Sequence, residues 1–115
     1  MVAMQVNRGR AQSLFINGLI VGIFGCTRIH PGVGECWALL AKDIYRYPKA
    51  TTKIAKKLVA DNMEIMKLHR MQVTTLNADT RAKKWLKCLG FEEEGVMRMF
   101  GPDKQDFVRY AKWIQ

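Results

Sequence analysis

The chain has 115 residues, of which 49% are hydrophobic and 25% charged, and this composition argues against both a disordered chain and a protein of several domains. Lys and Arg together number 19 and Asp and Glu 10, so the formal net charge is +9. A field of that sign favours nucleic acids, phosphates and acidic protein surfaces, with a solvated basic surface as the plainer alternative. We therefore expect a single basic domain over residues 1–115.

The thiol and imidazole groups are not spaced as metal ligands are. No two cysteines have CxxC spacing, and only two histidines accompany them. We interpret the cysteines as buried thiols in a reducing compartment. The apolar stretch 13–26 is too short and too interrupted by glycine for a transmembrane helix, and it lacks the order of a signal peptide. We expect no metal, no membrane contact and a cytoplasmic location; the cysteines are Cys26, Cys36 and Cys88.

The first third of the chain has the pattern of three strands. Asn17-Gly18 separates the apolar runs 13–16 and 19–24 and predicts a β-hairpin, because a type I′ turn needs positive φ at both central residues. Pro and Gly make 30–34 a loop. The nearly continuous apolar run 35–41 is typical of a strand buried on both faces.

Residues 50–69 are expected to form an amphipathic helix, because apolar side chains recur at helical spacing and charged ones fill the other face. Pro48 precedes its first turn, where proline is tolerated. A strand over 71–76 follows. Asn77 or Asp79 then caps a second helix, whose apolar stripe consists of Ala82, Trp85, Leu86 and Leu89.

The second helix is expected to end at Gly90 in the left-handed conformation, with Phe91 folding back on Leu86. Two further strands, 96–100 and 107–113, flank a turn over 101–104, in which proline fixes φ at the second position. We expect all three tryptophans to pack in the core rather than to stack on bases. They are Trp37, Trp85 and Trp113.

The second helix and its end carry a resemblance to a known family. Asp79-Thr80-Arg81-Ala82 leads to Leu89-Gly90-Phe91 and a Glu-rich stretch. This is similar to the Asn-x-x-Ala helix and Leu-Gly-Phe step of the GCN5-related N-acetyltransferase (GNAT) family, with Asp79 in place of the asparagine. The resemblance implies an α+β (α/β-like) fold with a mixed central sheet and the order β-β-β-α-β-α-β-β. The resemblance also implies that the chain lacks the usual first strand and first two helices of the family.

The resemblance also implies a site for acetyl-coenzyme A. The family motif Gln/Arg-x-x-Gly-x-Gly/Ala corresponds to the six residues from Arg46, with Lys49 and Thr51 at the glycine positions. Glycine there lets backbone N–H groups approach the pyrophosphate at a helix N-terminus. The contacts of those N–H groups with the pyrophosphate can be partly replaced by charge and hydrogen bonds from Lys49, Lys53 and the Thr51 and Thr52 hydroxyls. The implied cofactor-binding residues are Leu39, Leu40, Ala41, Arg46, Tyr47, Pro48, Lys49, Ala50, Thr51, Thr52, Asp79 and Ala82.

The reaction that the resemblance implies is acyl transfer from the thioester to an amine of a protein or small molecule. Such a transfer needs a base for the ammonium group, and Glu35 is the candidate, with Asp43 a weaker one and a solvent-facing strand end the alternative. The family's acid, a tyrosine seven residues after the asparagine position, corresponds to Leu86, which cannot donate a proton. The possible substitutes are Tyr45, Tyr47 and Cys88.

Cys36-Trp37 and Trp85-Leu86-Lys87 are similar to steps in GNAT-like phage proteins, including the internal virion protein of short-tailed phages. That resemblance implies the host cytoplasm or a phage virion as location. Two other functions stay open: a catalytically inactive GNAT fold that serves in the virion or contacts a host protein, and a basic nucleic-acid-binding module, for which no known motif is present.

Two surface properties bear on partners. An uncovered sheet edge and apolar surface predict a homodimer. The basic run in the second helix is interpreted as a solvated face, with an interaction surface for acidic partners as the alternative. That run consists of Arg81, Lys83, Lys84 and Lys87.

Overall fold

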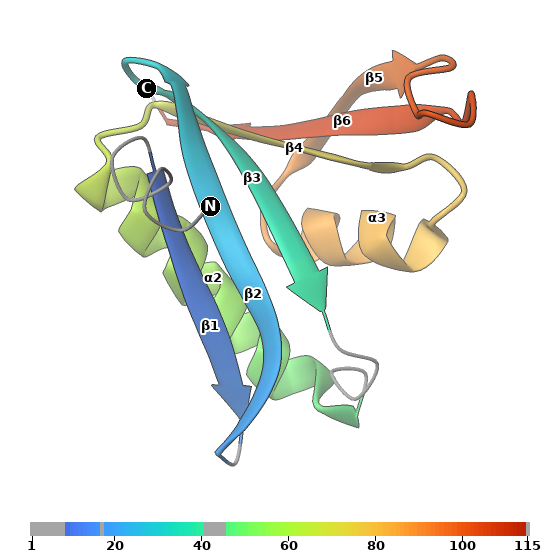
Figure 1. The fold of residues 1–115 in the computed structure, drawn as a ribbon. Helices are drawn as coiled ribbons and strands as arrows, with labels where there is room; N and C mark the ends of the chain where they lie inside the picture. Colours follow the sequence, from blue (N-terminus) through green and yellow to red (C-terminus); the bar gives the residue numbers. More distant parts are fainter. Residues whose placement is uncertain (1–8, 17, 41–45, 115) are drawn as a thin grey trace.

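The computed structural model describes residues 9–16, 18–40 and 46–114 of the chain. Six strands form one sheet in the order β1-β2-β3-β4-β6-β5, and two helices connect them (Figure 1). The predicted order β-β-β-α-β-α-β-β and the mixed α+β fold are confirmed. The elements are β1 (Gly9–Ile16), β2 (Leu19–His30), β3 (Val33–Leu40), α2 (Pro48–Ile65), β4 (Arg70–Leu76), α3 (Thr80–Cys88), β5 (Glu92–Met97) and β6 (Phe107–Trp113).

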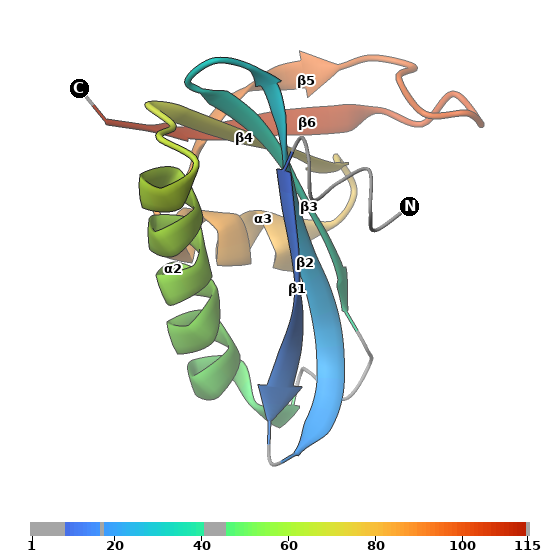
Figure 2. The same cartoon turned by 60° about the vertical axis from the view of Figure 1, so that its left-hand side comes forward.

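The sheet consists of two antiparallel halves. β1, β2 and β3 form one half and β4, β6 and β5 the other, and β3 and β4 join them as the parallel pair. Figure 2 shows both helices on the same side of this sheet. The core lies between the helices and the sheet, and its fully buried members include Val59, Leu68, Met71, Val108 and Tyr110. The described helices do not combine the length and hydrophobicity needed to cross a membrane.

The first hairpin is confirmed. β1 and β2 pair up to Ile16 and Leu19, and Gly18 has a φ of 80°; Asn17 lies outside the described residues. The predicted loop over 30–34 is wrong in extent, because β2 continues to His30 and β3 begins at Val33. Two residues, Pro31 and Gly32, suffice for the reversal, since Gly32 has a φ of 87° that leaves no need for a longer loop.

The helix α2 begins at Pro48 and ends at Ile65, earlier than the predicted 50–69 at both ends. Lys67 takes the left-handed conformation, with a φ of 54°, and Leu68 N–H donates to the Met63 carbonyl at 2.8 Å. This is the Schellman geometry that glycine usually provides. A lysine gives no such signal in the sequence, which explains the error at this end.

The helix α3 agrees with its predicted signals. The Asp79 carboxylate caps it by accepting a hydrogen bond from Ala82 N–H at 3.0 Å. Gly90 is left-handed, with a φ of 94°, and Phe91 N–H donates to the Leu86 carbonyl at 3.0 Å. Cap and stop together confine this helix to nine residues.

Three expectations for the second half of the chain are wrong. The strand predicted over 96–100 is β5 at Glu92–Met97, where consecutive glutamates occupy an edge strand and hide the strand pattern. Trp113 is not a core residue but 46% exposed. Cys88 is exposed on α3, whereas Cys26 and Cys36 are buried as predicted. The turn over 101–104 is confirmed by the bond from Lys104 N–H to the Gly101 carbonyl.

Candidate functional site

The two halves of the sheet separate part of the way along their junction. The parallel pairing of β3 with β4 begins at Val33 and Arg70 and ends at Cys36 and Val73. Beyond that point β4 continues beside β6 and β3 continues beside β2. The carboxyl ends of the two parallel strands therefore diverge, which is where ligands bind in many sheets that contain parallel strands.

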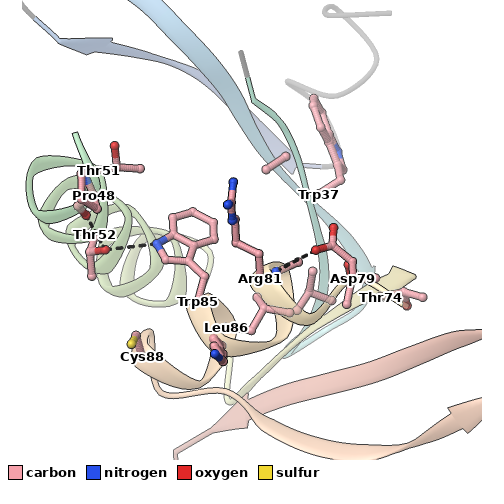
Figure 3. Close-up of a pocket in the computed structure, with 15 residues that line it drawn as sticks. Trp37, Pro48, Thr51, Thr52, Thr74, Asp79, Arg81, Trp85, Leu86 and Cys88 are labelled. Carbon is pink, nitrogen blue, oxygen red and sulfur yellow. Dashed lines mark hydrogen bonds between the residues drawn. The ribbon is translucent and has the colours of Figure 1, made fainter. Parts of the chain in front are cut away.

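A cavity of about 770 Å³ occupies this divergence. The divergent ends of β3 and β4, the first turn of α2 and most of α3 contribute to its wall, as Figure 3 shows. Most of the wall is apolar or hydroxyl-bearing. The lining residues are Trp37, Ala38, Pro48, Thr51, Thr52, Val73, Thr74, Thr75, Asp79, Arg81, Ala82, Lys84, Trp85, Leu86 and Cys88.

The cavity receives side chains from both faces of the sheet. Cys36 points into the core under the helices, so Trp37, the next residue of the strand, points to the opposite face. A Cβ atom added at Gly25 would lie 2.2 Å from the Trp37 ring, so the indole covers Gly25 on that helix-free face. Figure 3 shows Trp37 and Trp85 on opposite sides of β3. The cavity is thus lined from both faces of the sheet, and we call its two sides the helix-side mouth and the mouth on the helix-free face.

The N-terminus of α2 places hydrogen-bond donors near the helix-side mouth. Tyr47 provides no side-chain cap, and the N–H groups of Lys49 and Ala50 lie in the first turn, where no carbonyl precedes them within the helix. Thr51 is only 6% exposed and lines the cavity. Within the described part of the chain its Oγ1 atom has no hydrogen-bond partner. Groups of this kind at a helix N-terminus bind anions.

The charge around this mouth is positive. A second hollow of about 440 Å³ adjoins the cavity, shares Pro48 and Thr52 with it, and is otherwise lined by three lysines. Arg81 and Lys84 line the cavity itself. Among the described residues that line either hollow, Asp79 is the sole carboxylate, and it already accepts the capping bond. The three lysines are Lys49, Lys53 and Lys56.

The structure brings together part of the predicted cofactor site. Lys49 lines the second hollow, whereas Arg46, Tyr47 and Ala50 lie at the start of α2 and line neither hollow. Leu39 and Leu40 end β3, and Ala41 lies outside the described residues, as do Asp43 and Tyr45. The predicted residues that line the cavity are Pro48, Thr51, Thr52, Asp79 and Ala82.

Glu35 does not line the cavity. It lies two residues before Trp37 and so faces the same side of the sheet, where Gln72 Nε2 donates to its Oε1 at 2.9 Å. Arg70 Nε donates to Gln72 Oε1 at 3.1 Å, and the Arg70 guanidinium also pairs with Glu94. That hydrogen-bonded pair lowers the pKa of Glu94.

The spacing of Trp37 and Trp85 predicts core packing and does not reveal that both side chains line the cavity. Trp85 Nε1 donates to Thr52 Oγ1 at 3.2 Å, and that hydroxyl donates in turn to the Pro48 carbonyl at 2.7 Å. This chain of bonds fixes α3 against the first turn of α2. The pattern of half-buried tryptophans beside hydroxyl residues is too common to have marked the site.

Several acetyltransferases of known structure have a similar arrangement. RimJ of Mycobacterium smegmatis, in complex with coenzyme A disulfide, superposes with a TM-score of 0.85 and 18% identity, over 97% of this chain and 57% of its own. The ribosomal-protein-S5-alanine acetyltransferase of Vibrio fischeri gives 0.80 and 17%, over 96% and 64%. The microcin C7 self-immunity acetyltransferase, bound to acetyl-coenzyme A and AMP, gives 0.83 and 16%, over 99% and 66%. No protein-family model and no curated protein sequence matches the chain.

The chain therefore has the fold of the GNAT acetyltransferases. It spans 66% of the length of a probable acetyltransferase that it resembles with a TM-score of 0.81 and 19% identity. At such identity the likeness concerns the fold.

Proposed function

We propose that the chain is an N-acyltransferase that takes its acyl group from a phosphopantetheine thioester, with acetyl-coenzyme A as the reference donor, and passes it to an amine of a protein or small molecule. The observation that carries the proposal is the cavity between β3 and β4, which adjoins the unpaired Thr51 hydroxyl at the N-terminus of α2. A slender, uncharged arm ending in phosphate suits such a cavity, whose wall is mostly apolar or hydroxyl-bearing.

In this proposal the phosphate lies at the first turn of α2. The amides of Lys49 and Ala50, the Thr51 hydroxyl and the Lys49 ammonium group supply donors and positive charge there. Because Lys49 and Thr51 carry side chains where the family motif has glycine, the anion is held by side chains as well as backbone. The arm then extends between Trp85 and the end of β4 toward the open edge of β3.

The acceptor amine enters from the helix-free face, where Trp37 borders the cavity. The amine nitrogen attacks the thioester carbonyl, a C–N bond forms and the C–S bond breaks. The amine loses a proton and the thiolate gains one. Backbone N–H groups on the edge of β3 beyond Cys36, which β4 no longer covers, are placed to stabilise the developing oxyanion.

Glu35 is the proposed base. Its carboxylate faces the same side as Trp37 and accepts a bond from Gln72, which leaves further lone pairs for a proton. Since Glu35 does not line the cavity, the proton reaches it through a water molecule. The position of the family's acid holds Leu86, which is 7% exposed and apolar, so the departing thiolate takes its proton from solvent or from the relay.

A second function, a catalytically inactive GNAT fold that contacts a virion or host protein, is favoured by this same Leu86 and by the structural bond of Glu35 to Gln72. The two functions differ in turnover. Acetyl-coenzyme A binding with release of free thiol in the presence of amines supports the enzyme, and binding without thiol release over a broad amine screen supports the second function.

The first test is isothermal titration of the protein with acetyl-coenzyme A at low salt, with Thr51→Val as the site variant. Valine removes the unpaired buried hydroxyl, so the free protein should gain stability, by about 1 kcal/mol. Binding should weaken about tenfold or more, because a hydrogen bond to a charged group contributes about 1.5–3 kcal/mol. Thr80→Val at the exposed start of α3 is the control. If the affinity of Thr51→Val for acetyl-coenzyme A is unchanged, the phosphate does not lie at this position.

A further inference from the structure

We infer that the natural donor is carried by a protein: the acyl group is a thioester on the phosphopantetheine arm of a small acidic carrier protein, which docks on the helix side of this chain. The inference rests on the proposed function and adds the identity of the carrier. The docking site is the basic surface around the helix-side mouth, defined by Lys49, Lys53, Lys56, Arg81, Lys84 and Lys87, all exposed.

Charge on the two helices is segregated by sign. Residues 46–60 contain five Lys or Arg and residues 80–91 contain four, and neither stretch contains Asp or Glu. Among the described residues, the carboxylates that flank these stretches are Asp61, which pairs with Lys57 at 3.3 Å, Asp79, which caps α3, and Glu92 on β5. The bond between Trp85 and Thr52 holds the two basic stretches together across the helix-side mouth. A partner that reaches the cavity by this mouth therefore approaches a surface of predominantly positive charge, in which Asp79 is the one carboxylate among the described lining residues.

The extent of this surface suits a folded partner. An α-helix rises about 1.5 Å per residue, so the surface runs about 10 Å along α2 and about 9 Å along α3. It is also two helices wide, since α2 and α3 contribute to the same cavity. The phosphates of a single nucleotide occupy a smaller region. An acidic helix of a carrier protein, with carboxylates on successive turns, can contact the whole of such a surface.

The start of α2 suits one phosphate better than two. A pyrophosphate needs close approach to several backbone N–H groups, and the side chains of Lys49 and Thr51 occupy the positions where glycine would permit it. The arm of a carrier protein is joined to a serine by a single phosphodiester. Two first-turn amides and the Thr51 hydroxyl are a sufficient set of donors for one such group.

The same surface does not offer what single-stranded nucleic acid needs. Such binding relies on aromatic side chains on which bases stack. Among the described residues of α2 and α3 and the turn before α2, the aromatic ones are Tyr47 and Trp85, and both pack against the core. Compared with single-stranded nucleic acid, an acidic protein is therefore the partner that this surface favours.

The docked carrier delivers its thioester through the helix-side mouth and the amine enters from the helix-free face. The carrier loses the acyl group when the C–S bond breaks and leaves as the free thiol, while the acyl carbon bonds to the amine nitrogen. No redox partner or further cofactor takes part in this exchange.

The test measures fluorescence anisotropy of a labelled fatty-acid-type acyl carrier protein in three forms: without the arm, with the free phosphopantetheine arm, and with the acetylated arm. We expect the acetylated form to bind at least tenfold more tightly than the armless form, with an affinity that falls steeply as salt rises. Acetyl-pantetheine, which has no phosphate, serves as the probe for the cavity alone.

The charge variants are Lys56→Glu/Lys87→Glu and, as control, Arg98→Glu/Lys104→Glu in the connection between β5 and β6, which changes the net charge equally. The first should weaken carrier binding at least tenfold and leave acetyl-pantetheine binding unchanged, and the second should do neither. If both double variants change the affinity for the carrier to the same extent, the docking surface is wrong.

Three other outcomes are decisive. If acetyl-coenzyme A binds and is turned over but the acetylated carrier binds no better than the armless form, the carrier is wrong and the proposed function stands. If no thioester probe binds, the proposed function fails as well. If a double-stranded DNA oligonucleotide displaces the carrier at physiological salt with equal or higher affinity, the surface is a nucleic-acid site and the inference is overturned.

Discussion

The indole N–H of Trp85 donates to the hydroxyl of Thr52 at 3.2 Å, and this one bond links the middle of α3 to the first turn of α2 beside the cavity. The two residues come from helices that are separated in sequence by the whole of β4. The bond determines how far apart the walls of the helix-side mouth lie, because both residues line the cavity.

This bond can be measured with a double-mutant cycle of Trp85→Phe and Thr52→Val. We expect a coupling energy of about 0.5–1.5 kcal/mol in chemical denaturation, since the pair is half-buried and neutral. The single variants should also weaken acetyl-coenzyme A binding. Strictly additive effects on unfolding would mean that the two side chains do not stabilise each other.

Gly25→Ala tests the position of Trp37. The new Cβ would lie 2.2 Å from the indole, which must therefore move out of its place at the cavity. We expect a loss of about 1–3 kcal/mol in the free energy of unfolding and a shift in Trp fluorescence. The double variant Gly25→Ala/Trp37→Ala should be less destabilised than the sum of the two single variants. Absence of this rescue would place the indole elsewhere.

The cap of α3 separates two roles of Asp79. Asp79→Ala removes the acceptor for Ala82 N–H and should cost about 1 kcal/mol of stability. Asp79→Asn retains an oxygen acceptor and should be nearly neutral in thermal unfolding. Because the asparagine variant also removes the one carboxylate among the described lining residues, we expect it to bind acetyl-coenzyme A more tightly than the parent protein. Equal loss of stability in both variants would contradict the cap.

The pair of Arg70 and Glu94 predicts a dependence of stability on pH. Its hydrogen bonds lower the pKa of Glu94 in the folded chain, so folding favours the ionised carboxylate. The contribution is present above the unfolded pKa of glutamate, about 4.3, and is lost as the pH falls through the lower folded value. Glu94→Gln should therefore reduce stability at pH 7, and the difference from the parent should shrink on acidification. A difference that does not vary with pH would show that the pair makes no ionic contribution.

The three cysteines should differ sharply in reactivity. Cys88 is exposed, whereas Cys26 and Cys36 are buried as direct neighbours on β2 and β3. The hydrogen bond with Cys26, together with burial, raises the pKa of the Cys36 thiol and keeps it protonated. We expect one fast thiol in the folded protein and three after unfolding, as counted by alkylation and mass spectrometry. Cys88→Ser should abolish the fast reaction, and persistence of that reaction would contradict the burial.

Local chemistry explains which elements were predictable from sequence. Asn17-Gly18, Asp79 and Gly90 act within a few residues of themselves, so the first hairpin and both ends of α3 followed from the sequence. Lys67 ends α2 in a conformation that its residue type does not indicate, and that end was missed.

Burial and the cavity depend on contacts between distant segments. Trp113 is predicted in the core from its spacing, but it is the last residue of β6 and is 46% exposed. The position of Trp37 at the cavity depends on Gly25 of the neighbouring strand. Patterns in a single sequence do not reveal this pairing. The homodimer, the phage origin and the acceptor stay predictions.

The two halves of the sheet are joined by four residue pairs between β3 and β4, so a ligand in the cavity can affect the stability of both halves. These pairs are the sole backbone ladder that joins the two halves of the sheet in the described chain, and they lie at one end of the junction. A molecule that fills the cavity supplies contacts where the ladder has stopped, so it extends the junction from one end toward its full length. Ligand binding should therefore appear as slower amide exchange in both halves of the sheet, far from any atom that the ligand touches.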